Sequence, residues 1–495
     1  MRPTLNIPLT LSQDTRGVAS FTNSEAGKDQ RRVNCHYLIT RTAVDAQPDI
    51  AIAKRPGVTG DGNTYGAATQ IQYLMARDPA STWDPTAWVL VKDGDISKAV
   101  TSSTATTILN NSAYYPRFWD ITDVSGTNFL VVQLQNGSSP SGTPAQKVYY
   151  SSAIATFTEI SDADFTGLSQ RGKMEFIDGY AFIMDSRCRI YQSDINSLSA
   201  WGSTNYITLS STNAPAQGII KCRSQILGFT TDYVETFRNE GNATGSVLSR
   251  VTGTEHRIGL ASLAGGGTMT GKLGYYVSLG DLVFFLGRYG GSKNDASLVA
   301  YDGNRYEKVS RPNEDTLLSN TTVYGLHKWS FGGKVAVYVQ LTAPTATTQK
   351  GWAFFPDINE GFFVESTVWG PANNGYHYTG ATDPQKAYYF GTSDNFQDDG
   401  TNYTMTVQFR LPIASLEYKA MSMCGVVADT TGSASNLAVS FSDDDCANFS
   451  TARNIDLSKK QKELYRCGVF RERHVKLTST GNVEARMRRF YASIT

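Results

Sequence analysis

Apolar and polar residues alternate in short runs along most of the chain, and clusters of Gly, Ser, Asn and Asp separate these runs. Residues 405–411 (MTVQFRL) and 437–441 (LAVSF) alternate in this way, which predicts half-buried β-strands. Helical periodicity is nearly absent, and residues 458–464 are the one stretch that suggests either a helix or a loop. The pattern therefore predicts an all-β protein.

A loose unit of roughly 45–55 residues recurs between about residues 65 and 405, a spacing typical of β-propeller blades. Each unit combines an apolar run with an aromatic-rich hairpin. The apolar runs are residues 179–184, 226–229, 282–286 and 335–339, and the hairpins span residues 147–160, 189–209, 298–309 and 352–364. Because inner strands crowd the axis of a propeller while outer strands can carry large side chains, this order predicts a propeller of about six blades.

The regions on either side of the repeats differ from them, so we expect three parts. Residues 1–64 are predicted to form an N-terminal arm and first strands that close onto the propeller, which spans residues 65–405. Residues 406–495 are predicted to form an appended C-terminal β-sandwich. Within the first part, Arg55-Pro56-Gly57 has the composition of a turn, in which Pro fixes φ and Gly supplies a positive φ.

Composition supports sheets and gives no global attraction to charged partners. The 495 residues contain 44 Gly, 26 Tyr and 23 Phe but only 18% charged residues, and the 45 basic residues balance the 45 acidic ones. We expect no stable membrane insertion, since no apolar run approaches the length of a membrane span, and we see no pattern of a signal peptide. The six scattered cysteines predict reduced, buried thiols.

Motifs that carry enzyme chemistry are not found in the sequence. There is no phosphate-binding loop, nucleophile elbow, zinc-protease motif or dinucleotide fingerprint, so we expect no catalytic residue, no cofactor and no metal. Residues 442–449 (SDDDCANF) resemble an Asp-box and predict a turn, with a calcium site on residues 443–445 as the alternative. Two points stay open: a carboxylate pair of the kind that glycosidases use, and whether residues 255–257 (EHR) form a solvated loop or an interface.

The C-terminal region is locally basic, and alternation on strands would place some of these residues on one face. One interpretation is a solvated sheet face with acidic partners such as Glu472 and Glu484. The other is a subunit interface, or a surface that meets passing DNA. The candidate residues are Arg471, Arg473, Lys476, Arg486, Arg488 and Arg489.

Several segments, in this order, resemble the tail nozzle (hub) family of short-tailed bacteriophages, the podoviruses, whose best-known members are called packaged DNA stabilisation proteins. The resemblance covers most of the chain except residues 61–150, and it consists of strand and turn patterns. The segments are residues 34–38 (NCHYL), 54–58 (KRPGV), 191–194 (YQSD), 216–220 (AQGII), 226–229 (ILGF), 234–237 (VETF), 440–449 (SFSDDDCANF) and 471–477 (RERHVKL).

This resemblance implies a structural virion protein that is made in the host cytoplasm. It would form a homohexameric ring below the head-to-tail adaptor, retain packaged DNA, pass double-stranded DNA without sequence preference, and anchor tail fibres or tailspikes. Two other interpretations remain: a generic propeller scaffold, and a glycan-binding or glycan-hydrolysing propeller used for receptor binding. Exposed tryptophans would favour the glycan interpretation, and the candidates are Trp83, Trp88, Trp119, Trp329, Trp352 and Trp369.

Overall fold

The chain is almost entirely β-structure and divides into two compact units. The larger unit comprises residues 61–349 and 369–387, and the smaller unit comprises residues 1–60, 350–368 and 388–495. This computed structural model describes residues 4–8, 31–40, 49–60, 71–75, 87–92, 95–100, 106–109, 114–136, 146–152, 156–210, 213–261, 276–289, 296–321, 323–331, 334–342, 348–371, 376–378, 387–390, 395–412, 417–431 and 435–495.

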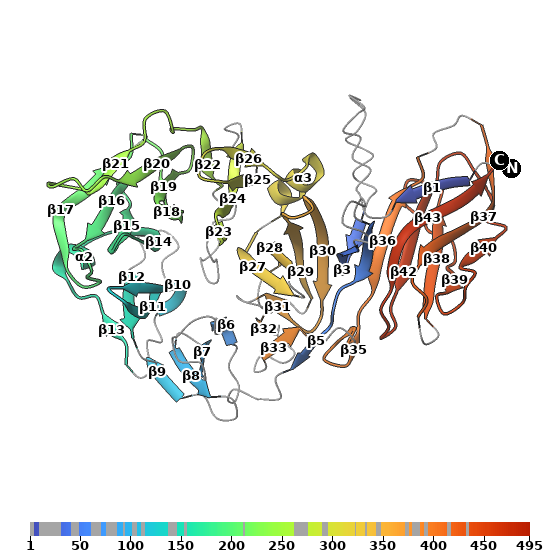
Figure 1. Cartoon of the computed structure of the whole chain (residues 1–495), viewed down its shortest axis with the longest axis horizontal. Coiled ribbons are helices and arrows are strands. Elements are labelled where there is room, and N and C mark those ends of the chain that lie inside the picture. The colour runs from blue at the N-terminus through green and yellow to red at the C-terminus, as the bar shows by residue number, and fades with distance from the viewer. Residues whose placement is uncertain are drawn as a thin grey trace. The chain divides into compact units, whose positions relative to one another are not determined.

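The larger unit is a series of antiparallel sheets whose strands follow one another in sequence (Figure 1). Two of these sheets are four-stranded meanders, and a third sheet of eight strands consists of two such meanders joined at a single residue pair, Lys173 and Ile219. One further sheet has five strands, and two hairpins follow. The strands are β6 (Ile71–Met75), β7 (Ala87–Lys92), β8 (Asp95–Val100), β9 (Thr106–Leu109); β10 (Tyr114–Val124), β11 (Thr127–Asn136), β12 (Gln146–Ser151), β13 (Thr158–Glu159); β14 (Gln170–Ile177), β15 (Tyr180–Asp185), β16 (Arg189–Ser193), β17 (Trp201–Thr208); β18 (Ala216–Cys222), β19 (Gln225–Thr230), β20 (Val234–Asn239), β21 (Leu248–Arg250); β22 (Ile258–Leu260), β23 (Tyr276–Leu279), β24 (Leu282–Tyr289), β25 (Ser297–Tyr301), β26 (Tyr306–Lys308); β27 (Gly325–Phe331), β28 (Lys334–Gln340); and β31 (Gly370–Pro371), β32 (Tyr376–Tyr378).

Successive sheets of this unit lie against one another, which makes it a β-propeller. Strand β14 contacts both β10 and β18, strand β19 contacts β22, and strand β23 contacts β27. The series returns to its start, because β32 lies against β6 of the first sheet. The predicted hairpins at residues 147–160, 189–209 and 298–309 are confirmed as the pairs β12–β13, β16–β17 and β25–β26.

The unbroken apolar runs have a simple cause in this architecture. Strand β19 has neighbours on both sides within its sheet, and both faces of that sheet are covered. Its consecutive residues Ile226 and Leu227 therefore enter two different cores, one shared with the preceding four-stranded meander and one shared with the following sheet. In the next sheet, Phe285 of β24 joins the second of these cores. A strand buried on both faces needs apolar residues at every position instead of at every second one.

The described residues of the larger unit include two short helices, and neither was expected. Helix α2 spans Ala163–Thr166 and helix α3 spans Pro312–Asn320. The signal for α3 was present, since Pro312 opens the helix and the Glu314 carboxylate accepts a hydrogen bond from the Arg311 backbone N–H at 2.7 Å. Residues 458–464 are not helical: they form a turn that leads into a strand. No helix among the described residues is long and apolar enough to cross a membrane.

The smaller unit is a sandwich of two sheets. One sheet has the order β3-β4-β43-β37-β40, with β1 also on β43 and β41 also on β37; the other contains β29-β30-β2-β36-β42-β38-β39. Phe409 and Phe490 meet between the sheets with ring centroids 5.2 Å apart, so the predicted C-terminal sandwich is confirmed. The strands are β1 (Thr4–Pro8), β2 (Arg31–Val33), β3 (Cys35–Thr40), β4 (Asp49–Lys54), β5 (Val58–Gly60), β29 (Gln349–Phe355), β30 (Glu360–Ser366), β33 (Ala387–Phe390), β34 (Gln397–Asp398), β35 (Thr401–Asn402), β36 (Met405–Arg410), β37 (Lys419–Ala428), β38 (Asn436–Ser442), β39 (Arg453–Asp456), β40 (Glu463–Tyr465), β41 (Val469–Phe470), β42 (His474–Ser479) and β43 (Arg486–Ile494).

Strands from the first 60 residues belong to both sheets of this sandwich. In one sheet β2 lies between β30 and β36, and in the other β4 pairs with β43. Strand β1 also pairs with β43 (Figure 1). The start of the chain is thus built into the same unit as its end. The division into residues 1–64, 65–405 and 406–495 stays a prediction, and the compact units group the segments differently.

The buried imidazole of His327 predicts that acid destabilises the larger unit. His327 lies on β27 with its Nε2 3.1 Å from Oε1 of Gln340, and burial lowers its pKa to about 4. The folded side chain therefore stays neutral while the unfolded chain takes up a proton below about pH 6.5. Stability that is present above pH 6.5 is lost as the pH falls towards 4, and we expect this residue alone to account for about 2–3 kcal/mol at pH 4.5.

The test compares the wild-type protein with His327→Gln in urea unfolding at pH 7.5 and pH 4.5. Glutamine has no proton to gain, so the acid-induced loss of unfolding free energy should be smaller in the variant by about 2–3 kcal/mol. Equal losses in the two proteins would show that His327 is not the group that responds. A general destabilisation by the substitution does not affect this result, because only the difference between the two pH values is compared.

Candidate functional site

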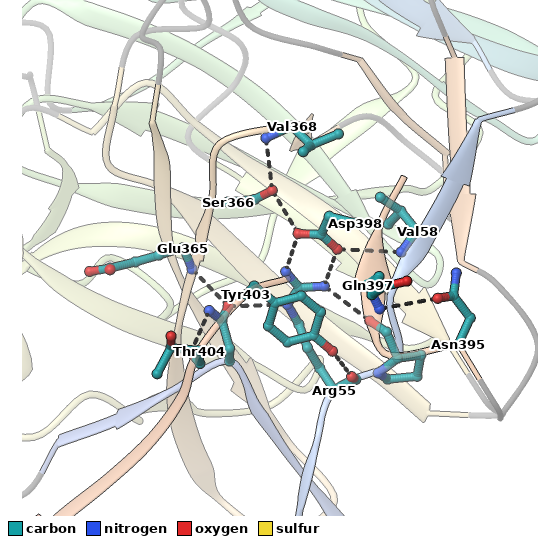
Figure 2. Close-up of polar contacts among 12 residues, drawn as sticks. Arg55, Val58, Glu365, Ser366, Val368, Asn395, Gln397, Asp398, Tyr403 and Thr404 are labelled. Atoms are coloured by element: carbon teal, nitrogen blue, oxygen red, sulfur yellow. Dashed lines mark hydrogen bonds and ion pairs between the residues drawn. The ribbon is translucent and has the colours of Figure 1, made fainter. Parts of the chain in front are cut away.

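A fully buried ion pair is the most distinctive polar feature of the smaller unit. The guanidinium of Arg55, at the end of β4, donates two hydrogen bonds to Asp398 of β34: Nη1 to Oδ1 at 2.8 Å and Nη2 to Oδ2 at 2.6 Å. Arg55 is 0% exposed and Asp398 is 2% exposed. This two-pronged geometry matches a planar fork to a carboxylate and fixes both partners (Figure 2).

Tyr403 covers this pair and brings a second cation to it. The Arg55 guanidinium lies 3.8 Å from the centroid of the Tyr403 ring, and the Lys54 ammonium lies 4.4 Å from the same centroid. The Tyr403 hydroxyl donates to the carbonyl oxygen of Arg55, and burial raises the pKa of this phenol. Both contacts place the positive charges against the electron-rich face of one ring.

Lys54 is also fully buried, and its positive charge is less well compensated than that of Arg55. Its ammonium donates to the carbonyl oxygen of Gly481 at 2.7 Å. Burial, followed by repulsion from Arg55, lowers the pKa of Lys54 to about 8, although Asp398 opposes this shift. The cluster holds two basic groups against one carboxylate, so the removal of that carboxylate would leave both without compensation.

Short polar contacts connect this cluster to several strands (Figure 2). Asp398 accepts hydrogen bonds from the Ser366 hydroxyl at 2.8 Å and from the Val58 backbone N–H at 3.4 Å. The Asn34 side-chain oxygen accepts from Arg55 Nε at 3.1 Å and from the Glu365 backbone N–H at 3.0 Å. We call Asn34, Lys54, Arg55, Ser366, Asp398 and Tyr403 the arginine clasp. It fastens the N-terminal strands to residue 366 and to residues 398–403 of the same unit.

Gly57 is needed beside the clasp for a reason other than the one expected. The sequence suggested that this glycine supplies a positive φ, but its φ is not in the left-handed region. Instead, the backbone of Gln397 approaches so closely that an added Cβ would lie 2.0 Å from its carbonyl oxygen. The Gly57 N–H also donates to the carbonyl oxygen of Asn395 at 2.7 Å. The turn therefore needs glycine for close packing of two backbones.

The clasp is a structural site and has no access for a substrate. A reactive group must contact its reactant, and the charged groups here are sealed from solvent. Residues 34–38 and 54–58 belong to the segments that carry the family resemblance. Nothing in the sequence indicated that they contact Ser366, Asp398 or Tyr403. Asp398 is 343 positions from Arg55 in sequence, so no local pattern indicates the pair.

The six basic residues singled out from the sequence do not form one surface. Arg473 is buried: its guanidinium makes a two-pronged contact with Asp443 at 2.6 and 2.7 Å and lies over the rings of Phe441 and Phe470. Arg471 is exposed and lies over the Tyr418 ring at 4.4 Å. The expected same-face alternation fails here because residues 471–472 form a bend and β42 begins only at His474.

The remaining four lie in or beside the sheets. Arg486 and Arg488 both reach Asp429, with closest N–O distances of 3.9 and 2.6 Å, and Arg486 also pairs with the expected partner Glu484 at 2.6 Å. The other expected partner, Glu472, pairs with Arg410. The ammonium of Lys476 lies 4.2 Å from the centroid of the Phe449 ring. Arg489 is exposed. Of the six candidates, Arg471 and Arg489 are thus the most accessible to a partner.

The segment that resembles an Asp-box forms the predicted turn. Asp444 accepts hydrogen bonds from the Ser442 hydroxyl at 2.7 Å and from the Asn448 backbone and side-chain N–H groups at 2.9 and 2.8 Å. The Ser442 contact and then those of Asn448 lower the pKa of Asp444 to about 2. Asp443 binds Arg473, whereas Asp445 lies 3.9 Å from His474. The three carboxylates thus have separate partners, and the described residues do not gather them into a calcium site.

Comparison with known proteins identifies no relative by sequence: no family model matches the chain, and no curated protein matches it. Solved structures do match. The chain is similar to the computationally designed Ika8 protein (12% identity, TM-score 0.38, 66% of this chain and 98% of that one). It is also similar to BamB from Moraxella catarrhalis (9%, 0.34, 65% and 100%) and to an exo-β-1,3-galactanase from Phanerochaete chrysosporium (8%, 0.29, 88% and 100%). Similarity at this level says nothing about what the chain binds or acts on.

Two carboxylates of the larger unit, those of Glu235 and Glu255, lie close enough together to be compared with a glycosidase pair. The hydroxyl of Ser210 lies 2.7 Å from a carboxylate oxygen of Glu235 and 3.1 Å from one of Glu255. Glu235 is completely buried and also pairs with Arg250 at 2.8 Å, so it is not accessible to a sugar. Glu255, His256 and Arg257 are exposed, and the His256 ring packs on Tyr306. This pair lacks the open geometry that a glycosidase requires.

The tryptophans that can be assessed are core residues. Trp329, Trp352 and Trp369 are each 1% exposed and therefore offer no face to a glycan. Trp83 lies outside the described residues, as do the side chains of Trp88 and Trp119. The described part of the chain therefore gives the glycan interpretation no exposed tryptophan platform.

Proposed function

We propose that this chain is a non-enzymatic structural protein of a short-tailed bacteriophage, the nozzle or hub subunit of its tail. Six copies would form a ring below the head-to-tail adaptor and continue the DNA channel. This ring would retain packaged DNA, pass it without sequence preference during ejection, and anchor tail fibres or tailspikes. The protein would be made in the host cytoplasm and act in the virion.

The observation that carries this proposal is the burial of the arginine clasp. Residues 54–58 are among those on which the resemblance to tail nozzle proteins depends, and Arg55 and Asp398 are sealed inside the smaller unit. A buried, multiply hydrogen-bonded charge pair fixes strands in place and does no chemistry on a substrate. Such a fastening suits a subunit that must keep its fold beside pressurised DNA.

Exposed apolar side chains support a role in an assembly. Tyr418 is 66% exposed, Tyr465 is 56% exposed and Val469 is 58% exposed. They lie close together in the fold, because β40 and β41 both pair with β37 and Tyr418 directly precedes that strand. Large apolar side chains at a surface favour contact with other protein. The zero net charge of the chain also permits close packing of identical subunits.

The proposal is tested by locating the chain in purified virions. A short C-terminal epitope, bound by a gold-labelled antibody fragment, should place gold at the tail axis beneath the head in electron micrographs. Gold on the capsid shell, or at the tips of fibres, would contradict the nozzle assignment.

A second measurement tests the ring directly. The wild-type chain mixed with its head-to-tail adaptor should give six-fold rings in negative-stain images, and the double variant Tyr465→Ser/Val469→Ser should give at least tenfold fewer rings. A matched control, Ile195→Ser, replaces an exposed apolar residue of the larger unit, 59% exposed, and should leave ring formation unchanged. A chain that stays monomeric with the adaptor would argue against the proposal.

A further inference from the structure

Two thiols meet inside the smaller unit. The six cysteines all lie among the described residues, and none of them is in a disulfide. The sulfur atoms of Cys424 and Cys467 are in contact, 3.5 Å apart. Cys424 lies on β37 and is 0% exposed, whereas Cys467 follows β40 and is 5% exposed. Their separation of 43 positions means that a bond between them would close a long loop.

The backbone holds Cys467 against β37. Leu464 of β40 lies opposite Cys424, and the chain then leaves the strand through two residues with positive φ, Arg466 at 59° and Gly468 at 84°. Between them, the Cys467 N–H donates to the carbonyl oxygen of Met421 at 3.0 Å. The contact between the sulfurs therefore rests on backbone pairing, so the two side chains are brought together by the fold itself.

The surroundings favour reactivity at Cys467. The hydrogen bond with Cys424 lowers the pKa of the Cys467 thiol to about 7 and raises that of Cys424. Two guanidinium groups lie near: Arg473 donates to the carbonyl oxygen of Cys467, and Arg453 donates to the carbonyl oxygens of Tyr465 and Arg466. A thiol with nearby cations and a lowered pKa has the larger thiolate fraction, and the thiolate is the nucleophile.

We propose that Cys424 and Cys467 are a site of reversible covalent modification, forming a disulfide cross-link between β37 and residues 466–468 when the protein meets a small-molecule disulfide such as oxidised glutathione. The proposal concerns this chain alone and does not depend on the function proposed above. The sulfurs need to approach by only ~1.5 Å, since a disulfide bond is about 2 Å long.

The reaction balances as an ordinary thiol–disulfide exchange. The Cys467 thiolate attacks one sulfur of the small disulfide, whose S–S bond breaks and releases one thiolate, which takes up the proton that Cys467 lost. Cys424 then loses its proton, and its thiolate attacks Cys467 Sγ in the mixed disulfide. The second small thiolate leaves and is protonated. The two cysteines lose two electrons, and the small disulfide is reduced to two thiols.

Access is the remaining requirement, and the covering segment lies at an edge of the sheet. Strand β40 has three residues and β41 has two, so few backbone hydrogen bonds resist a local opening. The side chains of Tyr465 and Val469, on either side of Cys467, are exposed. The more exposed thiol is therefore positioned for the first attack, and the fully buried thiol for the second.

The full-length chain, incubated with oxidised glutathione at pH 8, tests this inference. Thiol titration after denaturation should fall from six groups to four, and peptide mapping should find Cys424 joined to Cys467. Because the cross-link closes a long loop, the melting temperature of the smaller unit should rise by roughly 5–10 °C and return on addition of reductant. Cys424→Ser and Cys467→Ser should each abolish the joined peptide and the rise.

Cys446→Ser is the matched control, since Cys446 is the most accessible cysteine. This variant should still form the cross-link and keep the rise in melting temperature. Retention of all six thiols in the wild-type chain, a glutathione adduct that persists on Cys467, or a bond that involves Cys446 would each overturn the proposal.

Discussion

Asp398→Asn is expected to lower the free energy of unfolding of the smaller unit by about 3–5 kcal/mol, the usual loss when one partner of a buried ion pair is removed. Asparagine has nearly the same shape, so the loss reports charge and hydrogen bonding more than packing. Without the carboxylate, the guanidinium of Arg55 and the ammonium of Lys54 would remain buried together. Hydrogen exchange of residues 53–60, followed by mass spectrometry in increasing urea, measures the effect locally.

Glu365→Gln is the control for this prediction. Glu365 pairs with Arg31 at 2.8 Å in the same unit, but the two side chains are 32% and 53% exposed. A solvent-exposed pair is worth only about 0–1 kcal/mol, so this variant should be close to wild type. The double variant Arg55→Met/Asp398→Leu removes both charges and should recover most of the stability that Asp398→Asn loses. Similar losses for Asp398→Asn and Glu365→Gln would contradict a dominant role of the clasp.

Gly57→Ala is expected to destabilise the smaller unit by about 3 kcal/mol or more, because its new methyl group would overlap a backbone that cannot move aside cheaply. The atoms it would meet belong to the backbone of Gln397, directly before Asp398. The substitution therefore forces apart the two segments that the clasp joins. Thermal unfolding of the purified variant should show the loss as a lower melting temperature, and exchange of residues 53–60 should become faster.

Two further substitutions separate close packing from backbone conformation as the cause. Gly481→Ala lies in the same unit at a position where an added Cβ meets nothing within 4 Å, and it should cost less than about 1 kcal/mol. Gly57→Asn distinguishes the reasons for the glycine, since asparagine tolerates a positive φ better than alanine does. If close packing is the cause, asparagine should be at least as harmful as alanine. A well-tolerated asparagine would contradict the explanation based on close packing.

The strands of the sandwich were predictable because their signal is local. Met405, Val407 and Phe409 of β36 face the core while the residues between them are more exposed, and this alternation is visible in the sequence. The inner strands of the propeller sheets were predicted from their unbroken apolar runs. Such runs arise because successive residues of a strand enter two different cores, as they do in β19. A pattern within five or six residues is enough for such elements.

The candidate site was not predictable, because its partners are distant in sequence or depend on exact strand ends. Arg55 and Asp398 lie 343 positions apart, and either residue taken alone has the composition of a solvated loop. Arg471 and Arg473 were expected to share a face, but the bend before β42 turns one outward and the other inward to Asp443. At Arg488 a bulge, where the register shifts between Val427 and Ala428, alters the simple alternation of β43. Such irregularities follow from tertiary packing and leave no periodic trace.

The threading of the N-terminal strands has a consequence for how the protein is made. Strand β2 lacks its antiparallel partner β36, and β1 lacks its partner β43, until those strands have left the ribosome. At ordinary rates of translation, β1 and β2 wait roughly 20–100 s for these partners. The propeller strands meet their neighbours as they emerge, so they can fold during synthesis. A nascent chain that is stalled before residue 405 should therefore carry a folded propeller, while β1 lacks its partner strand and stays protease-sensitive.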